Sequence, residues 1–500
     1  MTLDIPHRPA GDHRVRPDLP IRWLGAALTV GLLTACATPV PPTESAGDLP
    51  PQWHAPMPAS APNAPAHGGK PASLASWWAQ FDDPALTRLI DAAQRNNGSV
   101  NEAAARIAQA RAGLRSAGAS ARPQADAGAS VQRGRSNAGA LATTGTVSVD
   151  MLWELDLFGG AQAGRSAALA QLQADQAAWH DARVSVAAET AQTYIALRRC
   201  EQQVAVLQAD AESLSRTADL TDRKVRAGFE SPANGALLRA SAASSAASLV
   251  AQQAQCEAFV KSLVALTGTP EPDLRQALSA GAQRLPQPKA FEVEAVPARW
   301  IAQRPDLRSI ERQAAAALKD VDVAEADRWP RLSLSGSVGR TRASGGGGLV
   351  FEGTTWSVGP SLSIPLFDGQ RRSAAVDAAR ARYEEARSRY AQRARDAVRE
   401  VETALVDLNA AERRQSDAER AVQGYEVFLE AQRRRTEAGA GSLLELEEAR
   451  RTALAARSTL VGIQADRVVA WVDLYRAVGG GWTPDDTHMA GSDGAPTTRP

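Results

Sequence analysis

The sequence predicts an α+β fold that is duplicated within the chain. Leu157-Phe158-Gly159-Gly160 returns as Leu366-Phe367-Asp368-Gly369, and Arg226-Ala227-Gly228-Phe229 returns as Glu437-Ala438-Gly439-Ala440. Each copy reads helix, strand, strand, very long helix, turn and helix. The strands are long enough to cross a membrane, and the helices are too long for a globular domain. Together these observations favour an elongated α+β membrane channel over a catalyst.

The composition limits the classes of function. The 500 residues include 56 basic and 56 acidic side chains, so no net basic surface predicts a nucleic-acid partner. Alanine is abundant and aromatic residues make up only 5%, which favours long, closely packed helices. Of the six histidines, only His180 lies inside a predicted element. The sequence contains no P-loop, HExxH or glycine-rich dinucleotide motif. We therefore expect no enzyme, no metal site and no cofactor.

The N-terminus resembles a bacterial lipoprotein signal. Arginines precede an apolar stretch at residues 23–33, which is too short to span a bilayer as a helix. The stretch ends in Leu33-Thr34-Ala35-Cys36, where Cys36 would become the lipidated first residue of the mature chain. An ordinary signal peptide with an incidental cysteine is the alternative. In many bacterial lipoproteins an aspartate after the lipidated cysteine retains the protein in the inner membrane. Here Ala37 occupies that position, so the resemblance implies transfer to the outer membrane. We expect a signal peptide at 1–35 and an extended, Pro- and Ala-rich tether at 36–76.

Two candidate strands in each repeat alternate apolar and polar residues. In the clearest one, Val147 and Trp153 share a face, and Asp150, Glu154 and Asp156 share the other. A barrel with lipid outside and water inside would place carboxylates this way, with these three in the lumen. A soluble hairpin with one buried face is the alternative. The strands are expected at residues 125–133, 146–157, 332–339 and 355–366.

Four strands cannot close a barrel, and open strand edges are not tolerated in lipid, so several chains must contribute strands. Between the strands, residues 136–145 and 343–353 have the Gly, Ser and Thr content of exposed loops. Glycine and proline residues mark the places where strand must turn into helix. These expected bends are Gly159, Gly160, Pro365 and Gly369.

The predicted helices have two lengths. Residues 161–227 and 371–438 each form one pattern of about 67 residues, or roughly 100 Å. Two short helices placed end to end match one long helix, which is the layout of a cylinder wall. The short helices are expected at 85–119, 235–266, 298–326 and 442–478. The resulting division is a first repeat at 77–286, a second repeat at 287–482 and a disordered tail at 483–500.

Two cysteines lie at equal distances along the chain from Gly228. If the chain reverses there, Cys200 and Cys256 stand at the same height on antiparallel helices, each on an apolar seam with 3/4 spacing. In an oxidising periplasm this arrangement predicts a disulfide. A pair of buried free thiols is the alternative.

Four stretches together carry a family resemblance. They are Trp77-Trp78-Ala79-Gln80-Phe81-Asp82-Asp83-Pro84-Ala85-Leu86, Arg304-Pro305-Asp306-Leu307-Arg308, Pro365-Leu366-Phe367-Asp368-Gly369 and Leu474-Tyr475-Arg476-Ala477-Val478-Gly479-Gly480-Gly481-Trp482. With them, the chain resembles the outer-membrane efflux protein family, the TolC-like channels, from about Trp77 to Trp482. The similarity is greatest to the lipoprotein branch that serves resistance-nodulation-division transporters.

The resemblance implies a homotrimer whose four strands per chain make one 12-stranded barrel, continued by an antiparallel coiled-coil periplasmic tunnel. It also implies three partners: outer-membrane lipids, a periplasmic membrane-fusion adaptor and an inner-membrane transporter. The adaptor would contact the helix tips, where Glu230 and Gly441 depart from the family pattern. A periplasmic gate is implied at Glu426 and Glu430, although carboxylates on a solvated helix face are the alternative. The tip residues are Ala227, Gly228, Phe229 and Ser231 in the first repeat, and Ala438, Gly439, Ala440 and Ser442 in the second.

The function implied is a passive exit duct for drugs or other small solutes in the outer membrane, with the chain lipid-anchored and largely periplasmic. Two other functions are compatible with parts of the sequence. A type I protein secretion channel would share the architecture, and the lipid anchor favours small-molecule efflux over it only through the resemblance. A periplasmic coiled-coil scaffold would need neither amphipathic strands nor Cys36.

Overall fold

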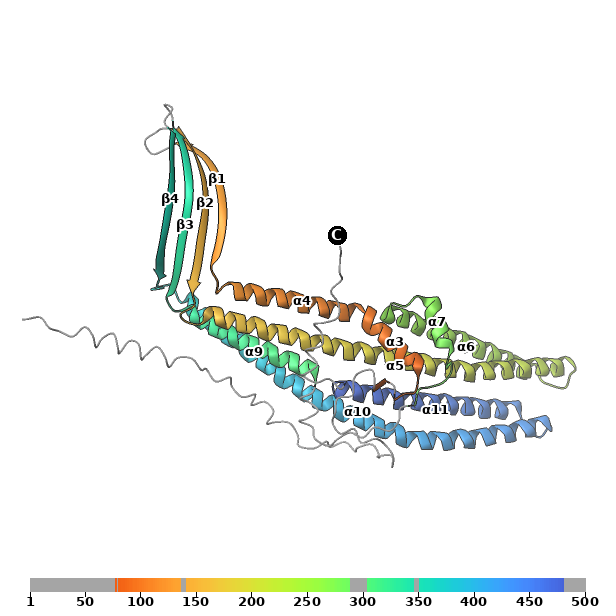
Figure 1. The fold of residues 1–500 in the computed structure, drawn as a ribbon. Helices are drawn as coiled ribbons and strands as arrows, with labels where there is room; N and C mark the ends of the chain where they lie inside the picture. Colours follow the sequence, from red (N-terminus) through yellow and green to blue (C-terminus); the bar gives the residue numbers. More distant parts are fainter. Residues whose placement is uncertain (1–76, 79, 136–140, 288–303, 346–349, 481–500) are drawn as a thin grey trace, which may run out of the picture. The chain divides into compact units, whose positions relative to one another are not determined.

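The computed structural model describes residues 77–78, 80–135, 141–287, 304–345 and 350–480 (Figure 1). The predicted signal peptide, the tether and the tail at 483–500 lie outside these residues. Within the described part, the same order of elements occurs twice, as helix, two strands, long helix and helix. The duplicated α+β order predicted from the sequence is therefore the order of the fold.

The four strands form one antiparallel sheet in the order β1-β2-β3-β4 (Figure 1). Each strand pairs with its neighbour in an unbroken register, so β1 and β4 are the two edges. The bounds are β1 Gln124–Arg135, β2 Leu141–Leu155, β3 Arg331–Gly345 and β4 Val350–Ser363.

The strands extend well into the segments expected to be loops. The ladder pairs Ala142 with Gly345 and continues to Arg135 opposite Leu141, so the loop prediction for 136–145 and 343–353 is wrong wherever the structure describes those residues. The Gly, Ser and Thr residues there are tolerated because a strand with a partner on each side needs no apolar side chains to keep its backbone hydrogen bonds. At the ends that lead into the long helices, two strands are shorter than expected: β2 ends at Leu155 and β4 at Ser363.

The two long helices agree with the sequence expectation. Helix α5 covers Gly160–Arg226 and α10 covers Arg371–Glu437, with 67 residues each. Their return helices are α6 (Pro232–Thr267) and α11 (Leu443–Ala477). Each return helix packs along the long helix of its own repeat. A short helix, α7 (Glu271–Ser279), follows α6 and was not expected from the sequence.

The first predicted helix is two helices. Helix α3 covers Pro84–Asn96 and α4 covers Gly98–Ala119, so the expectation of one helix at 85–119 is wrong. Asn97 interrupts the pattern because its backbone is extended and its side chain accepts a hydrogen bond from the Ser99 amide, which begins a new helix. The corresponding helix of the second repeat, α9, covers Pro305–Ala326 and begins at a proline, a residue favoured in the first turn.

The largest apolar core lies where α3, α5, α6, α10 and α11 meet. Trp77 and Trp78 each pack within 4.8 Å of the Tyr475 ring, measured between ring centroids. Asp83 caps the first turn of α3 and accepts a 2.6 Å hydrogen bond from the Tyr194 hydroxyl on α5. The start of the described chain is thus fixed to the middle of the long helices by burial and by a hydrogen bond.

Candidate channel wall and helix tips

The sheet has one apolar and one polar face, because side chains alternate along each strand and the register keeps like residues in rows. One row joins Ala127, Val149, Val338 and Trp356, and the next joins Met151 to Val358. These side chains are exposed in the single chain, and Trp356 is 76% exposed. From Val147 to Leu155 the apolar part of β2 covers roughly 26 Å along the strand. That length is close to the ~25 Å apolar band of outer-membrane barrels.

The opposite face is polar and carries every carboxylate of the described strands except Glu352. Asp126 on β1 lies directly opposite Asp150 on β2, and the same row continues through Ser337 and Ser357. Glu154 lies on this face too, opposite Ser333. Sequence reasoning found Asp150 and Glu154 but missed Asp126, because the alternation along β1 is weakened by glycine and alanine. The two faces are those of a wall between lipid and water.

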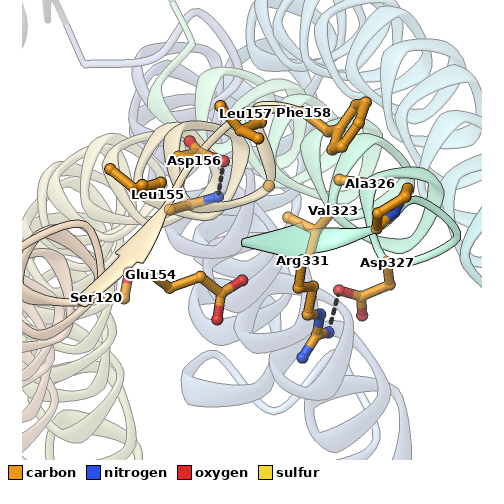
Figure 2. A pocket seen from close by; sticks show the side chains of 13 residues that line it. Ser120, Glu154, Leu155, Asp156, Leu157, Phe158, Val323, Ala326, Asp327 and Arg331 are labelled. Carbon is orange, nitrogen blue, oxygen red and sulfur yellow. Dashed lines mark hydrogen bonds and ion pairs between the residues drawn. The ribbon is translucent and has the colours of Figure 1, made fainter. Parts of the chain in front are cut away.

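Asp156 is not a strand residue, which corrects its placement on the polar face. It follows the end of β2, and its carboxylate accepts a 3.2 Å hydrogen bond from the backbone amide of Ala161 (Figure 2) and a 2.8 Å bond from that of Gln162. Alternation in the sequence continues past Leu155, but the free amides at the start of α5 bind this carboxylate instead. In the second repeat, Asp368 has the same role and accepts from the Arg372 amide.

The expected bends lie between the strands and the long helices. Gly159 and Gly369 have φ values of +76° and +63°, a conformation that glycine adopts without strain. A Cβ atom on Gly160 would lie 3.1 Å from the Ala326 side chain, so this glycine also permits close approach of α9. Pro365 follows the end of β4. A pocket of about 210 Å³ opens where the β2–α5 connection meets the α9–β3 connection, beside the Arg331–Asp327 ion pair (Figure 2).

Each long helix turns into its return helix through a glycine of positive φ, Gly228 at +77° and Gly439 at +73°. In the first turn, Phe229 is 84% exposed, and Ser231 caps α6. In the second turn, Ser442 caps α11 in a reciprocal capping box with Glu445. The remaining expected tip residues, Ala227, Ala438 and Ala440, are also exposed.

The two carboxylates expected at a gate are both in ion pairs within the chain. Glu426 on α10 lies 2.7 Å from Arg457 on α11, so it joins the two helices of the second repeat. Glu430 lies 2.9 Å from Arg434 and 3.1 Å from Arg433, both on its own helix. The structure therefore brings each of them to arginine rather than to the other.

Cys200 on α5 and Cys256 on α6 form a disulfide, with their Cα atoms 5.6 Å apart. In the described residues no cluster of His, Cys, Asp and Glu could hold a metal ion. Nor does any described helix have the length and apolar character needed to span a membrane.

Comparisons with known proteins agree with this architecture. The model of the family described as "Outer membrane efflux protein" matches residues 89–269 and 296–480. The chain is 28% identical over 469 residues to the pyoverdine export outer membrane protein OpmQ of Pseudomonas putida, covering 91% of this chain and 96% of that protein. It is also 28% identical to the solvent efflux pump outer membrane protein SrpC of Pseudomonas putida, covering 86% and 93%.

Among solved structures, the outer-membrane channel OprN is similar with a TM-score of 0.75 and 28% identity, over 87% of this chain and all of that one. The Campylobacter jejuni CmeC outer membrane channel shares the fold, with a TM-score of 0.74 and 24% identity over 87% of this chain and 97% of that one. The family model covers most of the residues that build the sheet and the long helices. This chain therefore belongs to the outer membrane efflux protein family.

Proposed function

We propose that three copies of this chain close a 12-stranded barrel in the outer membrane and continue it as a helical tunnel, through which small solutes leave the cell. The observation that carries this proposal is a four-stranded sheet with one apolar and one polar face and with unpaired edges on both sides. An unpaired edge in lipid leaves backbone groups without hydrogen bonds. Pairing of β1 in one copy with β4 in the next satisfies both edges.

In this assembly the polar face lines the bore, and Asp126, Asp150 and Glu154 lie along the water path. The apolar rows face the acyl chains. The turns at Gly228 and Gly439 are the ends of the helical part that lie farthest along the chain from the strands. An exposed Phe229 and two well-capped return helices support contact with a periplasmic adaptor there, and through it with an inner-membrane pump.

Three finer assignments belong to the same proposal. Cys36 carries the lipid that anchors the N-terminus in the outer membrane. Glu426 and Glu430 contribute to closure at the periplasmic end, where breaking of the Glu426–Arg457 pair would remove one polar link between α10 and α11. The cargo is a small molecule, as in the relatives named for pyoverdine and solvent export.

Strand pairing between copies tests the assembly. A cysteine at Ala127 combined with one at Trp356 or Val358 should cross-link between copies and give a dimer and trimer ladder, because β1 and β4 are the outermost strands of one chain. The matched control is Ala127→Cys with Val149→Cys, direct partners within the chain, which should give only an internal link. A scan of β4 positions that yields no intermolecular product would refute the barrel.

Deletion of the gene tests the transport function. We expect lower tolerance of dyes, detergents or organic solvents, restored by the full-length chain. Unchanged tolerance in a strain without a redundant channel, together with loss of a secreted protein, would instead identify a type I secretion channel.

A further inference from the structure

Basic side chains collect on the apolar face of the sheet at its hairpin end. They are Arg133 and Arg135 on β1 and Arg340 and Arg342 on β3, named here the distal arginines. The strand register places all four on the same face as the apolar rows, and all are exposed. They begin in the last of those rows, because Arg340 lies directly opposite Val147.

The patch has a net positive charge. Arg340 pairs with Glu352 at 3.0 Å, whereas the other three distal arginines have no ion pair with a described residue. The two connecting segments cannot neutralise them, since 136–140 reads Ser-Asn-Ala-Gly-Ala and 346–349 reads Gly-Gly-Gly-Leu. The sheet's other carboxylates lie on the opposite face. This end of the outer face therefore carries four arginines against one glutamate.

The position of the patch follows from chain connectivity, and this step rests on the proposed function. The helices join the strands at Gln124, Leu155, Arg331 and Ser363, whereas the distal arginines lie toward the other ends. With the helices in the periplasm, the hairpin end faces outward. The distal arginines are then level with the headgroups of the outer leaflet, directly above the apolar band.

We propose that the distal arginines bind the phosphate groups of lipid A, the glycolipid of the outer leaflet. A guanidinium group presents two parallel donors that match phosphate oxygens, and it remains charged at any physiological pH. Basic clusters beside a membrane attract anionic headgroups, with the contribution growing with each residue. The continuous apolar rows below the patch would contact the acyl chains of the same lipid. Three copies repeat the patch around the barrel as a belt.

The test is lipid binding by the detergent-extracted full-length trimer, measured by native mass spectrometry. The probes are diphosphorylated lipid A and the same lipid after enzymatic removal of its phosphates. We expect the wild type to bind the phosphorylated lipid about tenfold more tightly. Arg133→Gln, Arg135→Gln and Arg342→Gln combined should abolish this preference. The matched control removes the same charge from exposed residues of α10, as Arg387→Gln, Arg389→Gln and Arg395→Gln, and should keep it.

Several outcomes would overturn the inference. Equal binding of the two lipids by the wild type would overturn it. This comparison needs no variant, so it decides the question even if the triple variant fails to assemble. An unchanged preference in the triple variant would do so too. Displacement of lipid A by millimolar inorganic phosphate would identify a general anion site instead. A wild-type chain that stays monomeric without detergent would refute the proposed channel itself, which is a distinguishable result.

Discussion

The two repeats build the same architecture with different side-chain interactions. Helix α5 packs against α3, α4, α6, α9 and α11, and its buried residues include alanines together with larger side chains such as Tyr194, Ile195 and Leu197. Helix α10 packs mainly against α9 and α11 and carries far more arginine and glutamate on its surface. The first repeat thus supplies the central helix of the described fold, and the second supplies a more solvated one.

The return helices are also held in different ways. In the first repeat, Cys200–Cys256 links α5 to α6 covalently, in addition to the Asp222–Arg239 ion pair between the same helices. In the second repeat, the Glu426–Arg457 ion pair joins α10 to α11. The described residues of this repeat contain no disulfide. The comparison shows that the pair of long helix and return helix forms with or without a disulfide, because helix length and turn geometry determine the backbone arrangement. Stability should therefore respond to redox conditions through the first repeat, where the disulfide lies.

Removal of the disulfide should give the largest change. A cross-link across a sequence separation of 56 residues stabilises a chain by about 4 kcal/mol in the loop-entropy model. Cys200→Ala with Cys256→Ala should lower the melting temperature of the detergent-solubilised protein. Reductant should lower it in the wild type and leave the double variant unchanged. Peptides bearing Cys200 and Cys256 should shift in mass on reduction, and absence of that shift would show that the pair is not oxidised.

The contact between the repeats should respond to pH. Burial, with the neighbouring Asp306 carboxylate, raises the pKa of Asp181 on α5 from 3.8 to about 6, against the opposing effect of Arg304 and Arg393. The folded protein then holds this proton more tightly than the unfolded chain, so stability falls as pH rises from about 4 to about 6. The free energy of unfolding lost above that pH range is on the order of 3 kcal/mol.

Substitution of the same residue isolates its titration from that of other carboxyl groups. Asp181→Asn should remove its part of the fall in melting temperature between pH 4 and pH 6. Glu189→Gln is the matched control, since Glu189 is an exposed carboxylate on the same helix. Superimposable pH profiles for the wild type and Asp181→Asn would show that Asp181 titrates normally.

The negative charge that lines the bore, and hence its preference for cations, should come from the strands of the first repeat. Asp126 and Asp150 come from β1 and β2, whereas the same row on β3 and β4 holds Ser337 and Ser357. Carboxylates lining a pore favour cations. In planar bilayers, Asp126→Asn with Asp150→Asn should reduce the cation-to-anion permeability ratio about fivefold, which corresponds to roughly 1 kcal/mol. Ser337→Ala with Ser357→Ala should leave the ratio unchanged. Equal ratios in all three proteins would contradict the assignment of this face to the water path.

The helix caps should show the smallest difference. Ser442 takes part in a reciprocal capping box, whereas Ser231 makes a single capping hydrogen bond to Asn234. Each change to alanine should cost about 1 kcal/mol, with Ser442→Ala costing slightly more. Thermal melting of the two variants side by side measures the difference, and a larger loss for Ser231→Ala would reverse the expected order.

Long elements were predictable and their irregular ends were not. The 67-residue helices were identified within one residue because their turns are marked by glycines and their seams by regular spacing. The break at Asn97 was missed, since an asparagine side chain can cap a new helix or sit in a continuous one. The hairpin ends of β2, β3 and β4 were missed because Gly- and Ser-rich sequence shows no alternation of apolar and polar residues, although a strand paired in a sheet does not need that alternation.

The channel wall shows the same division. Alternation along β2 predicted which face is apolar, and it placed Asp150 and Glu154 correctly on the polar one. It failed at Asp156, whose carboxylate accepts hydrogen bonds from the free amides at the start of α5. Assignment of Asp126 to the polar face required the register between β1 and β2, which the sequence of β1 alone does not define.

The open margins of the sheet have a consequence for biogenesis. A solitary copy that entered the bilayer would expose to hydrocarbon the backbone groups on the open edge of β1, which are about half of those on this strand, at several kcal/mol for each unsatisfied group. Copies must therefore meet before or during insertion, and no pool of inserted monomers can accumulate. The yield of mature channel should consequently rise more steeply than linearly with the rate of synthesis.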